Sequence, residues 1–126
     1  MSYACYCDYD APEFYRVEIR KARKSFRCEE CGGPIKPGEK YEFVAGSWDH
    51  YVSQFRTCER CHDIRVWVKN NVPCFCWAHG NMVDDAREAV SEAAWRAPEE
   101  TKGLRFGFAR RLLLRDRHNK TAGAAA

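Results

Sequence analysis

Two cysteine pairs with the same internal spacing constrain this chain more than any other feature of its sequence. Cys28 and Cys31 form one C-x-x-C pair, and Cys58 and Cys61 form another after 26 intervening residues. Each pair can supply two corners of a tetrahedral zinc site from one tight turn. Two glycines follow the first pair, where a residue with positive φ lets backbone N–H groups point at the sulfur atoms. The spacing therefore predicts a four-cysteine zinc site.

The segment between the pairs predicts a hairpin followed by a helix. Aromatic residues alternate in "KYEFV" and again in "YVSQFRT", with the turn "AGSWDH" between them. In "CERCHDIRVWVKNN", Ile64, Trp67 and Val68 recur at helical spacing, and Pro73 ends that helix. The second cysteine pair thus lies at a helix N-terminus, whose positive dipole favours thiolates. This order of elements is that of the treble-clef zinc fold, in which the metal contributes about 10 kcal/mol of folding free energy.

The chain is expected to be one small α+β domain over residues 1–126, because its length suits a single modest core. We expect a treble-clef-like module over 28–71 and additional C-terminal helices. Residues 72–97 are expected to form a linker and a second helix, which begins near Met82. A basic segment over 98–118 and a mobile tail over 119–126 complete the chain. The apolar stripe of a third helix, near residues 105–117, is expected to be Phe106, Ala109, Leu112 and Leu113.

Four further cysteines occur in two C-x-C pairs, each flanked by aromatic residues. These are Cys5 and Cys7 in "CYCDY" and Cys74 and Cys76 in "CFCWAH". They favour a second zinc site that ties the N-terminus to the segment after the first helix, with His79 as a replacement ligand. The alternative is that some of these cysteines are small buried hydrophobic residues, as free cysteines often are.

The compartment is expected to be a bacterial cytoplasm. The chain has no apolar run long enough to cross a membrane, and "MSYACYCDYD" lacks the basic and apolar regions of a secretory signal. In a reducing cytosol, eight cysteines favour metal ligation over four disulfides.

The net charge of +3 is distributed unevenly. Residues 16–27 carry six basic residues and one acidic residue, and residues 102–120 carry seven and one, so the remainder is acidic. Two cationic strips indicate a surface that could bind phosphate groups of DNA or RNA with weak sequence specificity, although a solvated basic face explains them equally well. The candidate contacts are Arg20, Lys21, Arg23, Lys24, Arg27, Arg105, Arg110, Arg111 and Arg115.

One group of residues in the sequence could indicate an enzyme. "WDH" followed by "CERCH" resembles the HNH endonucleases, with Asp49, His50 and His62 at the matching positions. Two differences argue against this interpretation. Only seven residues separate His50 from Cys58, and no asparagine occurs between His50 and Cys61. We therefore expect no enzymatic activity and no small-molecule substrate.

The sequence resembles small proteins encoded by tailed bacteriophages and prophages. The resemblance rests on "CYCDYDAPEFYRVEIRKARKSFRCEECGGPIKPGEKYEFVAGSWD", "TCERC" and "VPCFCWAHG", and it covers roughly residues 5–97. It implies a bacterial host and brings no established activity. We expect a non-enzymatic accessory protein that binds a host or phage protein, such as a defence or gene-expression component. Trp48, His50 and Tyr51 at the hairpin turn are the candidate partner contacts, because aromatic residues are frequent at interfaces.

Overall fold

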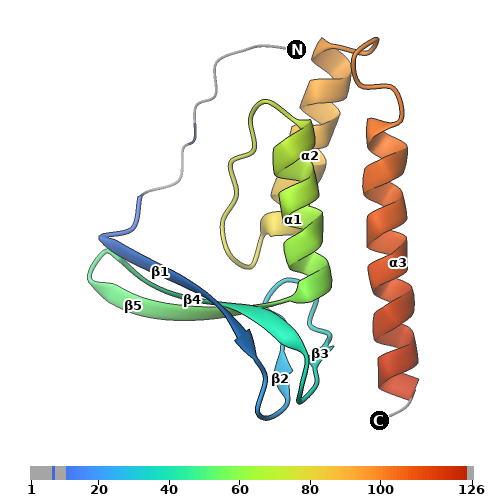
Figure 1. Cartoon of the computed structure of the whole chain (residues 1–126). Coiled ribbons are helices and arrows are strands. Elements are labelled where there is room, and N and C mark those ends of the chain that lie inside the picture. Colours follow the sequence, from blue (N-terminus) through green and yellow to red (C-terminus); the bar gives the residue numbers. More distant parts are fainter. Residues whose placement is uncertain (1–6, 8–10, 125–126) are drawn as a thin grey trace.

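A three-stranded antiparallel sheet and three helices make up this small α+β protein (Figure 1). The computed structural model describes residue 7 and residues 11–124. The sheet has the order β1 (Phe14–Lys21), β4 (Lys40–Trp48) and β5 (Tyr51–Cys58). A separate two-stranded ribbon pairs β2 (Phe26–Arg27) with β3 (Pro34–Ile35).

The expected hairpin is present as β4 and β5. Trp48 pairs with Tyr51, so the strands are joined by the two residues Asp49 and His50. Both residues have positive φ, 50° and 66° respectively. This conformation suits the right-handed twist of a tight hairpin, although glycine or asparagine usually supplies it. The turn therefore carries the side chains of Asp49 and His50 in a backbone conformation that favours glycine.

Strand β1 was not predicted from the sequence. It pairs with β4 along its whole length, from Phe14 opposite Ser47 to Lys21 opposite Lys40. The alternation of Val17 and Ile19 with charged residues carries the strand signal. The density of basic residues obscured this alternation.

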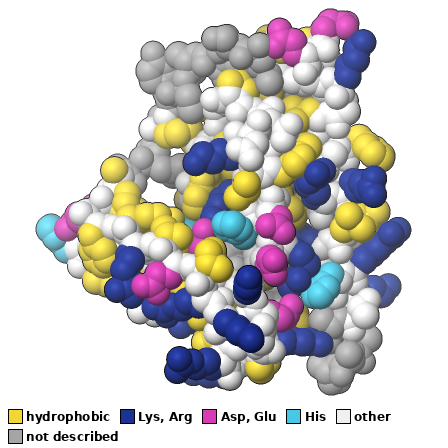
Figure 2. All heavy atoms as spheres, in the orientation of Figure 1, with side chains coloured by type: hydrophobic (Ala, Val, Ile, Leu, Met, Phe, Trp, Pro, Cys, Tyr) yellow, Lys and Arg dark blue, Asp and Glu magenta, His cyan; other side chains and the backbone are white. Residues whose placement is uncertain are grey.

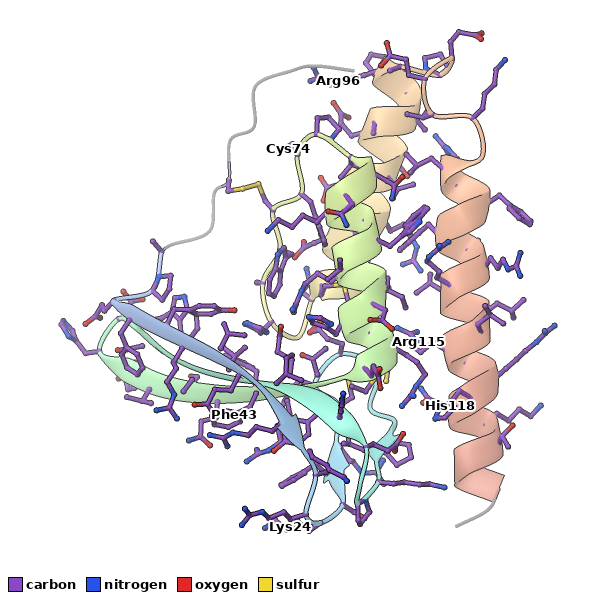
Figure 3. The ribbon with its side chains drawn as sticks, in the orientation of Figure 1. Lys24, Phe43, Cys74, Arg96, Arg115 and His118 are labelled. Carbon is purple, nitrogen blue, oxygen red and sulfur yellow. A yellow bond between two sulfur atoms is a disulfide. The ribbon has the colours of Figure 1, made fainter. Side chains whose placement is uncertain are left out.

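The two faces of the sheet have different surroundings. Glu42 of β4 forms a buried ion pair with Arg65, so this face of the sheet looks toward the helices. Side chains alternate along a strand, and Phe43 therefore lies on the opposite face. Figure 3 shows Phe43 on the side of the sheet away from the helices. We call this side the outer face.

The helices are α1 (Glu59–Asn71), α2 (Met82–Arg96) and α3 (Leu104–Ala124), and α3 lies alongside α1 (Figure 1). The first two match the expected segments. The buried side chains of the core come from the sheet and all three helices and include Ile35, Val44, Ile64, Val68, Met82, Ala86, Val90, Ala93, Leu104 and Phe108. In the part of the chain that the structure describes, no helix is both long and apolar enough to cross a membrane.

Helix α3 differs from its prediction in length and in its buried face. It continues to Ala124, well beyond the expected end, through residues that had been assigned to the tail. The predicted stripe is confirmed at Leu112, which packs against the core, and is wrong at Phe106, Ala109 and Leu113, which are exposed; Phe106 is 71% exposed. Leu104 and Phe108 are buried instead, and Gly107 meets Trp67 of α1 at a distance that leaves no room for a Cβ atom. Because of this close contact, the buried face of α3 is rotated about the helix axis by about one residue from the predicted face.

The second zinc site is corrected at three of its four cysteines, which are disulfide-bonded. Cys7 and Cys76 form a disulfide with a Cα–Cα distance of 5.3 Å, within the usual range for such bonds. Sulfur atoms bonded to each other are not thiolates and cannot ligate zinc. Cys74 is disulfide-bonded as well, and its Sγ lies 3.8 Å from that of Cys76. Cys5 lies outside the described residues.

Candidate metal centre and neighbouring surfaces

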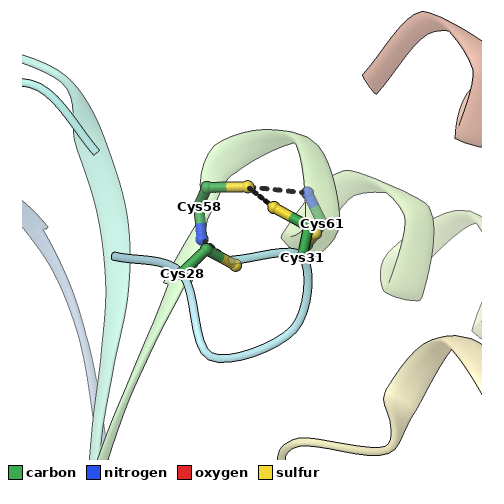
Figure 4. A group of neighbouring side chains, drawn as sticks. All are labelled: Cys28, Cys31, Cys58 and Cys61. Carbon is green, nitrogen blue, oxygen red and sulfur yellow. Dashed lines mark hydrogen bonds between the residues drawn. The ribbon is translucent and has the colours of Figure 1, made fainter. Parts of the chain in front are cut away.

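Four free cysteines converge between the β2–β3 ribbon and the start of α1 (Figure 4). Cys28 and Cys31 come from the turn of that ribbon, and Cys58 and Cys61 come from the end of β5 and the first turn of α1. Their four Sγ atoms all lie within 4.8 Å of one another, close enough to hold one metal ion. The Cys31–Cys58 sulfur distance is 3.8 Å, which equals the edge of a tetrahedron with metal–sulfur bonds of about 2.3 Å. The predicted first quartet is confirmed as a candidate metal centre.

Backbone N–H groups point at these sulfur atoms from both turns. The N–H of Glu30 donates to Cys28 Sγ and that of Gly33 to Cys31 Sγ, each at 3.4 Å. Cys28 Sγ also accepts from the N–H of Cys58 at 3.3 Å. Gly32 has φ of +69°, the conformation predicted for the residue after the first pair. Such contacts spread the negative charge that four thiolates would carry.

The four thiols of the cluster shift one another's pKa values in opposite directions. Hydrogen bonds from Cys28, Cys58 and Cys61 lower the pKa of Cys31 far below its usual range. Hydrogen bonds to Cys28 and Cys31 raise the pKa values of Cys58 and Cys61, with burial adding to both shifts. The pKa of Cys28 falls to about 7, because the hydrogen bond with Cys31 raises it less than Cys58 and Cys61 lower it. Four buried thiolates are stable together only when a positive ion offsets their charge.

Helix α3 reaches the metal centre with two side chains that sequence reasoning did not place there. The Asn119 amide donates to Cys31 Sγ at 3.3 Å, and the Arg115 guanidinium donates to Cys61 Sγ at 3.7 Å. Gly33 allows this approach, since a Cβ there would lie 2.6 Å from the Asn119 side chain. The two donors are four residues apart and therefore lie on one face of the helix. This spacing was the sequence signal that could have identified them as a pair.

The first cysteine turn also holds helix α2. The carboxylate of Glu30, between Cys28 and Cys31, accepts hydrogen bonds from the backbone N–H groups of Gly80 and Met82. These groups lie at the start of α2, where N–H groups lack partners within the helix. Asn81, the residue at the cap position, makes no side-chain cap hydrogen bond. The metal centre therefore positions the second helix as well as the first.

The predicted partner residues lie at the tip of the β4–β5 hairpin. Tyr51 is 77% exposed, and the neighbouring Val52 is exposed too. His50 is also exposed, and its ring lies 3.4 Å from Glu13. Trp48 turns inward and packs edge-to-face against Phe55, with ring centroids 5.9 Å apart.

An apolar pocket of about 640 Å³ opens beside this tip. Its lining comes from all three strands of the sheet and the loop after α1: Pro12, Tyr15, Trp48, Ser53, Phe55, Trp77, Ala78 and His79. His79, expected as a replacement zinc ligand, instead stacks on Phe55 at a centroid distance of 4.4 Å. Its Nε2 lies 3.0 Å from the Tyr15 hydroxyl. Burial, aided by the charge of Arg65, lowers the pKa of His79 to about 4, so the ring is neutral near pH 7.

The candidate phosphate contacts fall into two groups. Those of residues 16–27 surround the turn after β1, where Arg20, Lys21, Arg23 and Lys24 line one hollow. Arg27 instead donates to the Gly32 carbonyl. On α3, Arg105 and Arg110 are exposed.

Two arginines of α3 serve the structure instead of facing solvent. Arg111 lies over the ring of Trp67, with Cζ 4.2 Å from its centroid. Arg115 has a side chain only 12% exposed and points toward α1, where it contacts Cys61 Sγ (Figure 3). Contact of Arg111 and Arg115 with phosphate stays a prediction, since each guanidinium already has a partner within the structure.

The residues that matched an endonuclease do not form one site. His50 lies at the hairpin tip, whereas His62 lies on the first turns of α1, at the other end of β5. His62 contacts Glu42 at 3.5 Å and Asp63 at 3.8 Å. Among the described residues, only the four cysteines form a cluster that could hold a metal ion. Neither histidine therefore belongs to a potential metal-binding cluster within the described part of the chain.

Comparisons with protein families, with curated proteins and with solved structures gave no match. The resemblance to phage-encoded proteins consequently stays a prediction, and function is argued from the residues.

Proposed function

We propose that this protein is a non-enzymatic, zinc-braced protein that binds a protein partner through the aromatic pocket beside the β4–β5 hairpin tip. The observation that carries the proposal is the pocket itself, which is open, apolar and walled by aromatic rings. Binding sites are typically concave and apolar with a few polar groups. The partner belongs to the bacterial host or the phage, and the site of action is the cytoplasm.

Zinc is the metal that best suits the centre. Four thiolates at tetrahedral spacing favour zinc, and a complete set of four protein ligands leaves no open position for water or substrate. The ribbon turn, the hairpin and the helix follow the order of a treble-clef-like module. The ion therefore has a structural role, which agrees with a binding protein.

The pocket walls are held rigidly by contacts behind them. Arg65 lies over the Trp77 ring, with Cζ 4.4 Å from its centroid, and its guanidinium pairs with buried Glu42. Trp77 in turn meets His79 edge-on at 4.7 Å, and His79 stacks on Phe55. A preformed pocket costs little ordering entropy when a ligand enters. This chain of contacts links the pocket to α1 and supports a binding role.

The occupant is a bulky apolar side chain of the partner, which would act as an anchor residue. Indole and phenyl walls gain from apolar contact, and anchors of this kind dominate binding free energy at interfaces. The exposed Tyr51, on the same face of β5 as Ser53 and Phe55, extends the apolar area along the hairpin tip. Asp49 and His50 project from a strained turn, and residues held in such conformations occur often at ligand-binding sites.

A displayed random-peptide library, panned against the zinc-loaded chain, tests this proposal. Enriched peptides should share one bulky apolar residue and bind with micromolar or better affinity, measured by calorimetry. Ser53 lines the pocket on β5, and Ser53→Arg should fill it and abolish binding. Gln54 lies on the outer face of the same strand, so Gln54→Arg is the matched control and should bind normally.

The proposal fails if no sequence is enriched, or if both arginine variants bind equally well. Affinity capture from nuclease-treated host lysate, with the same pair of variants, then names the natural partner. Incubation of plasmid with the protein and Mg²⁺ or Mn²⁺ tests the alternative of a nuclease, and we expect no cleavage.

A further inference from the structure

Arg20 of β1 and Arg56 of β5 lie over aromatic rings on the outer side of the sheet, namely Phe43 of β4 and Phe26 of the β2–β3 ribbon. Arg20 Cζ is 3.8 Å from the centroid of the Phe43 ring, and Arg56 Cζ is 4.4 Å from that of Phe26. Arg56 also lies 5.4 Å from the Phe43 centroid. Two guanidinium planes therefore cover neighbouring rings on one side of the sheet.

The guanidinium of Arg20 is fixed in place and still accessible. Its Nε and one terminal nitrogen each lie 2.7 Å from the same carboxylate oxygen of Glu18. The Arg20 side chain remains 38% exposed. A planar cation with one face on a ring and the other toward solvent can stack on a further flat group.

A cationic hollow adjoins these arginines. It has a volume of about 1170 Å³ and lies at the turn between β1 and β2, where its lining includes Arg20, Lys21, Arg23 and Lys24. Figure 2 shows Lys and Arg side chains gathered along this lower part of the molecule. Lys24 extends from the turn, as Figure 3 shows. Such a group of cations, close together in the chain, suits repeated phosphate contacts.

We propose that the outer face and this hollow bind single-stranded nucleic acid. Lys21, Arg23 and Lys24 contact phosphates, while Arg20 stacks on an unpaired base. Phe14, exposed on the outer face of β1, offers a further stacking surface. Single strands are favoured over duplexes, because only unpaired bases present their faces for stacking on guanidinium or aromatic planes.

The inference is independent of the proposed protein-binding pocket, which lies on the opposite face of the sheet. Phe43 and Arg20 occupy the outer face, whereas Phe55 and Trp48 line the pocket on the face toward the helices. The sheet can thus bind a protein partner on one face and nucleic acid on the other, without competition between the two ligands. Failure of either proposal leaves the other unaffected.

Fluorescence anisotropy with a labelled 15-nucleotide oligo(dT), a labelled oligo(U) and a labelled mixed-sequence duplex tests the proposal on the zinc-loaded chain. Single strands should bind at least tenfold more tightly than the duplex. The double variant Arg23→Gln and Lys24→Gln should lower the slope of log K against log salt by about 1.4, at roughly 0.7 per phosphate contact. The matched control, Arg105→Gln with Arg110→Gln on α3, should leave the slope unchanged.

Arg20→Lys separates stacking from charge. It keeps the positive charge and loses the planar group, so affinity for single strands should fall at least fivefold with no change in salt slope. Unchanged melting temperature and zinc content would show that the variants are folded. Equal binding of duplex and single strands, equal binding of poly-glutamate, or unchanged affinity in both Arg20→Lys and the Arg23→Gln, Lys24→Gln double variant would each overturn the proposal.

Discussion

The side-chain amide of Asn119, near the C-terminal end of α3, donates a hydrogen bond to Cys31 Sγ at 3.3 Å. This contact joins residues 88 positions apart and brings the last helix onto the metal centre. Arg115, one helical turn earlier, makes the corresponding contact with Cys61 Sγ. The two contacts explain why α3 continues past the expected end of the helix. They make the polar side chains of this helix part of the surroundings of the metal.

Asn119→Ala should weaken metal binding without removing a ligand. Groups that hydrogen-bond to metal ligands typically change affinity by 10- to 100-fold, and we expect about tenfold here. The measurement is competition for zinc with a chromogenic chelator. Lys120→Ala changes the exposed neighbour and should retain the affinity of the unmodified chain. Equal affinities for the two variants would contradict a role for Asn119 at the centre.

Removal of one ligand should unfold the unit between the ribbon and α1. Cys61→Ser leaves three thiolates, and we expect loss of the cooperative unfolding transition together with loss of bound zinc, since such sites supply about 10 kcal/mol in small finger peptides. Circular dichroism and elemental analysis report the two losses. Chelation of the metal from the unmodified chain should produce the same spectrum. A folded Cys61→Ser variant would show that the sheet and helices are stable without the ion.

The sequence predicted the centre well because both pairs carry a local signal. Each C-x-x-C turn specifies its own geometry, and the helix and hairpin between them have clear periodicities. The contacts from Arg115 and Asn119 depend on how α3 packs, which no local pattern encodes. The predicted stripe of α3 was right only at Leu112, because the helix has apolar residues on several sides, and the contact of Gly107 with Trp67 decides which side is buried.

The remaining differences also have physical causes. Strand β1 was obscured by its charged residues, although Val17 and Ile19 alternate as a strand requires. The two C-x-C pairs were interpreted as metal ligands because a reducing compartment was assumed, whereas Cys7 and Cys76 are bonded to each other. The Glu30 cap of α2 joins residues about fifty positions apart and becomes visible only in the fold.

The bond between Cys7 and Cys76 predicts one zinc ion per chain and a measurable stabilisation. It closes a loop with a sequence separation of 69, for which chain entropy gives about 4 kcal/mol. Cys7→Ser should therefore lower the free energy of unfolding in urea under oxidising conditions and leave the zinc content at one. With reductant present, the difference from the unmodified chain should disappear. Two zinc ions in the unmodified chain and one in Cys7→Ser would show instead that these cysteines bind metal.

Glu30 should stabilise α2 through its two backbone contacts. Glu30→Ala leaves the N–H groups of Gly80 and Met82 without this partner, and loss of such a cap costs about 1 kcal/mol. Glu29→Ala removes the exposed neighbouring carboxylate and is the matched control. Urea unfolding of the two zinc-loaded variants measures the difference. Similar stabilities would indicate that water replaces the carboxylate at no cost.

His79 should make stability fall as the pH is lowered from about 6.5 toward 4. Burial, as the largest cause, lowers its pKa in the fold from 6.5 to about 4, so within this window the unfolded chain binds a proton that the folded chain does not. Stability therefore rises with pH across the window and is fully present above pH 6.5. The whole shift corresponds to about 3 kcal/mol, and partial exposure of the ring reduces our expectation to about 1–2 kcal/mol.

The variant His79→Gln isolates this effect from protonation of the cysteine ligands, which both proteins share. Urea unfolding at pH 4.5, 5.5, 6.5 and 7.5 should give a shallower dependence for His79→Gln, even though loss of stacking on Phe55 lowers its stability at every pH. Tyr15→Phe removes the hydroxyl beside Nε2 and keeps the burial that is the main cause of the shift, so its pH dependence should match that of the unmodified chain. Parallel curves for the unmodified chain and His79→Gln would mean that His79 titrates alike in the folded and unfolded states. The pocket would then be open enough to hydrate a charged imidazole, which would count against an apolar side chain as its occupant.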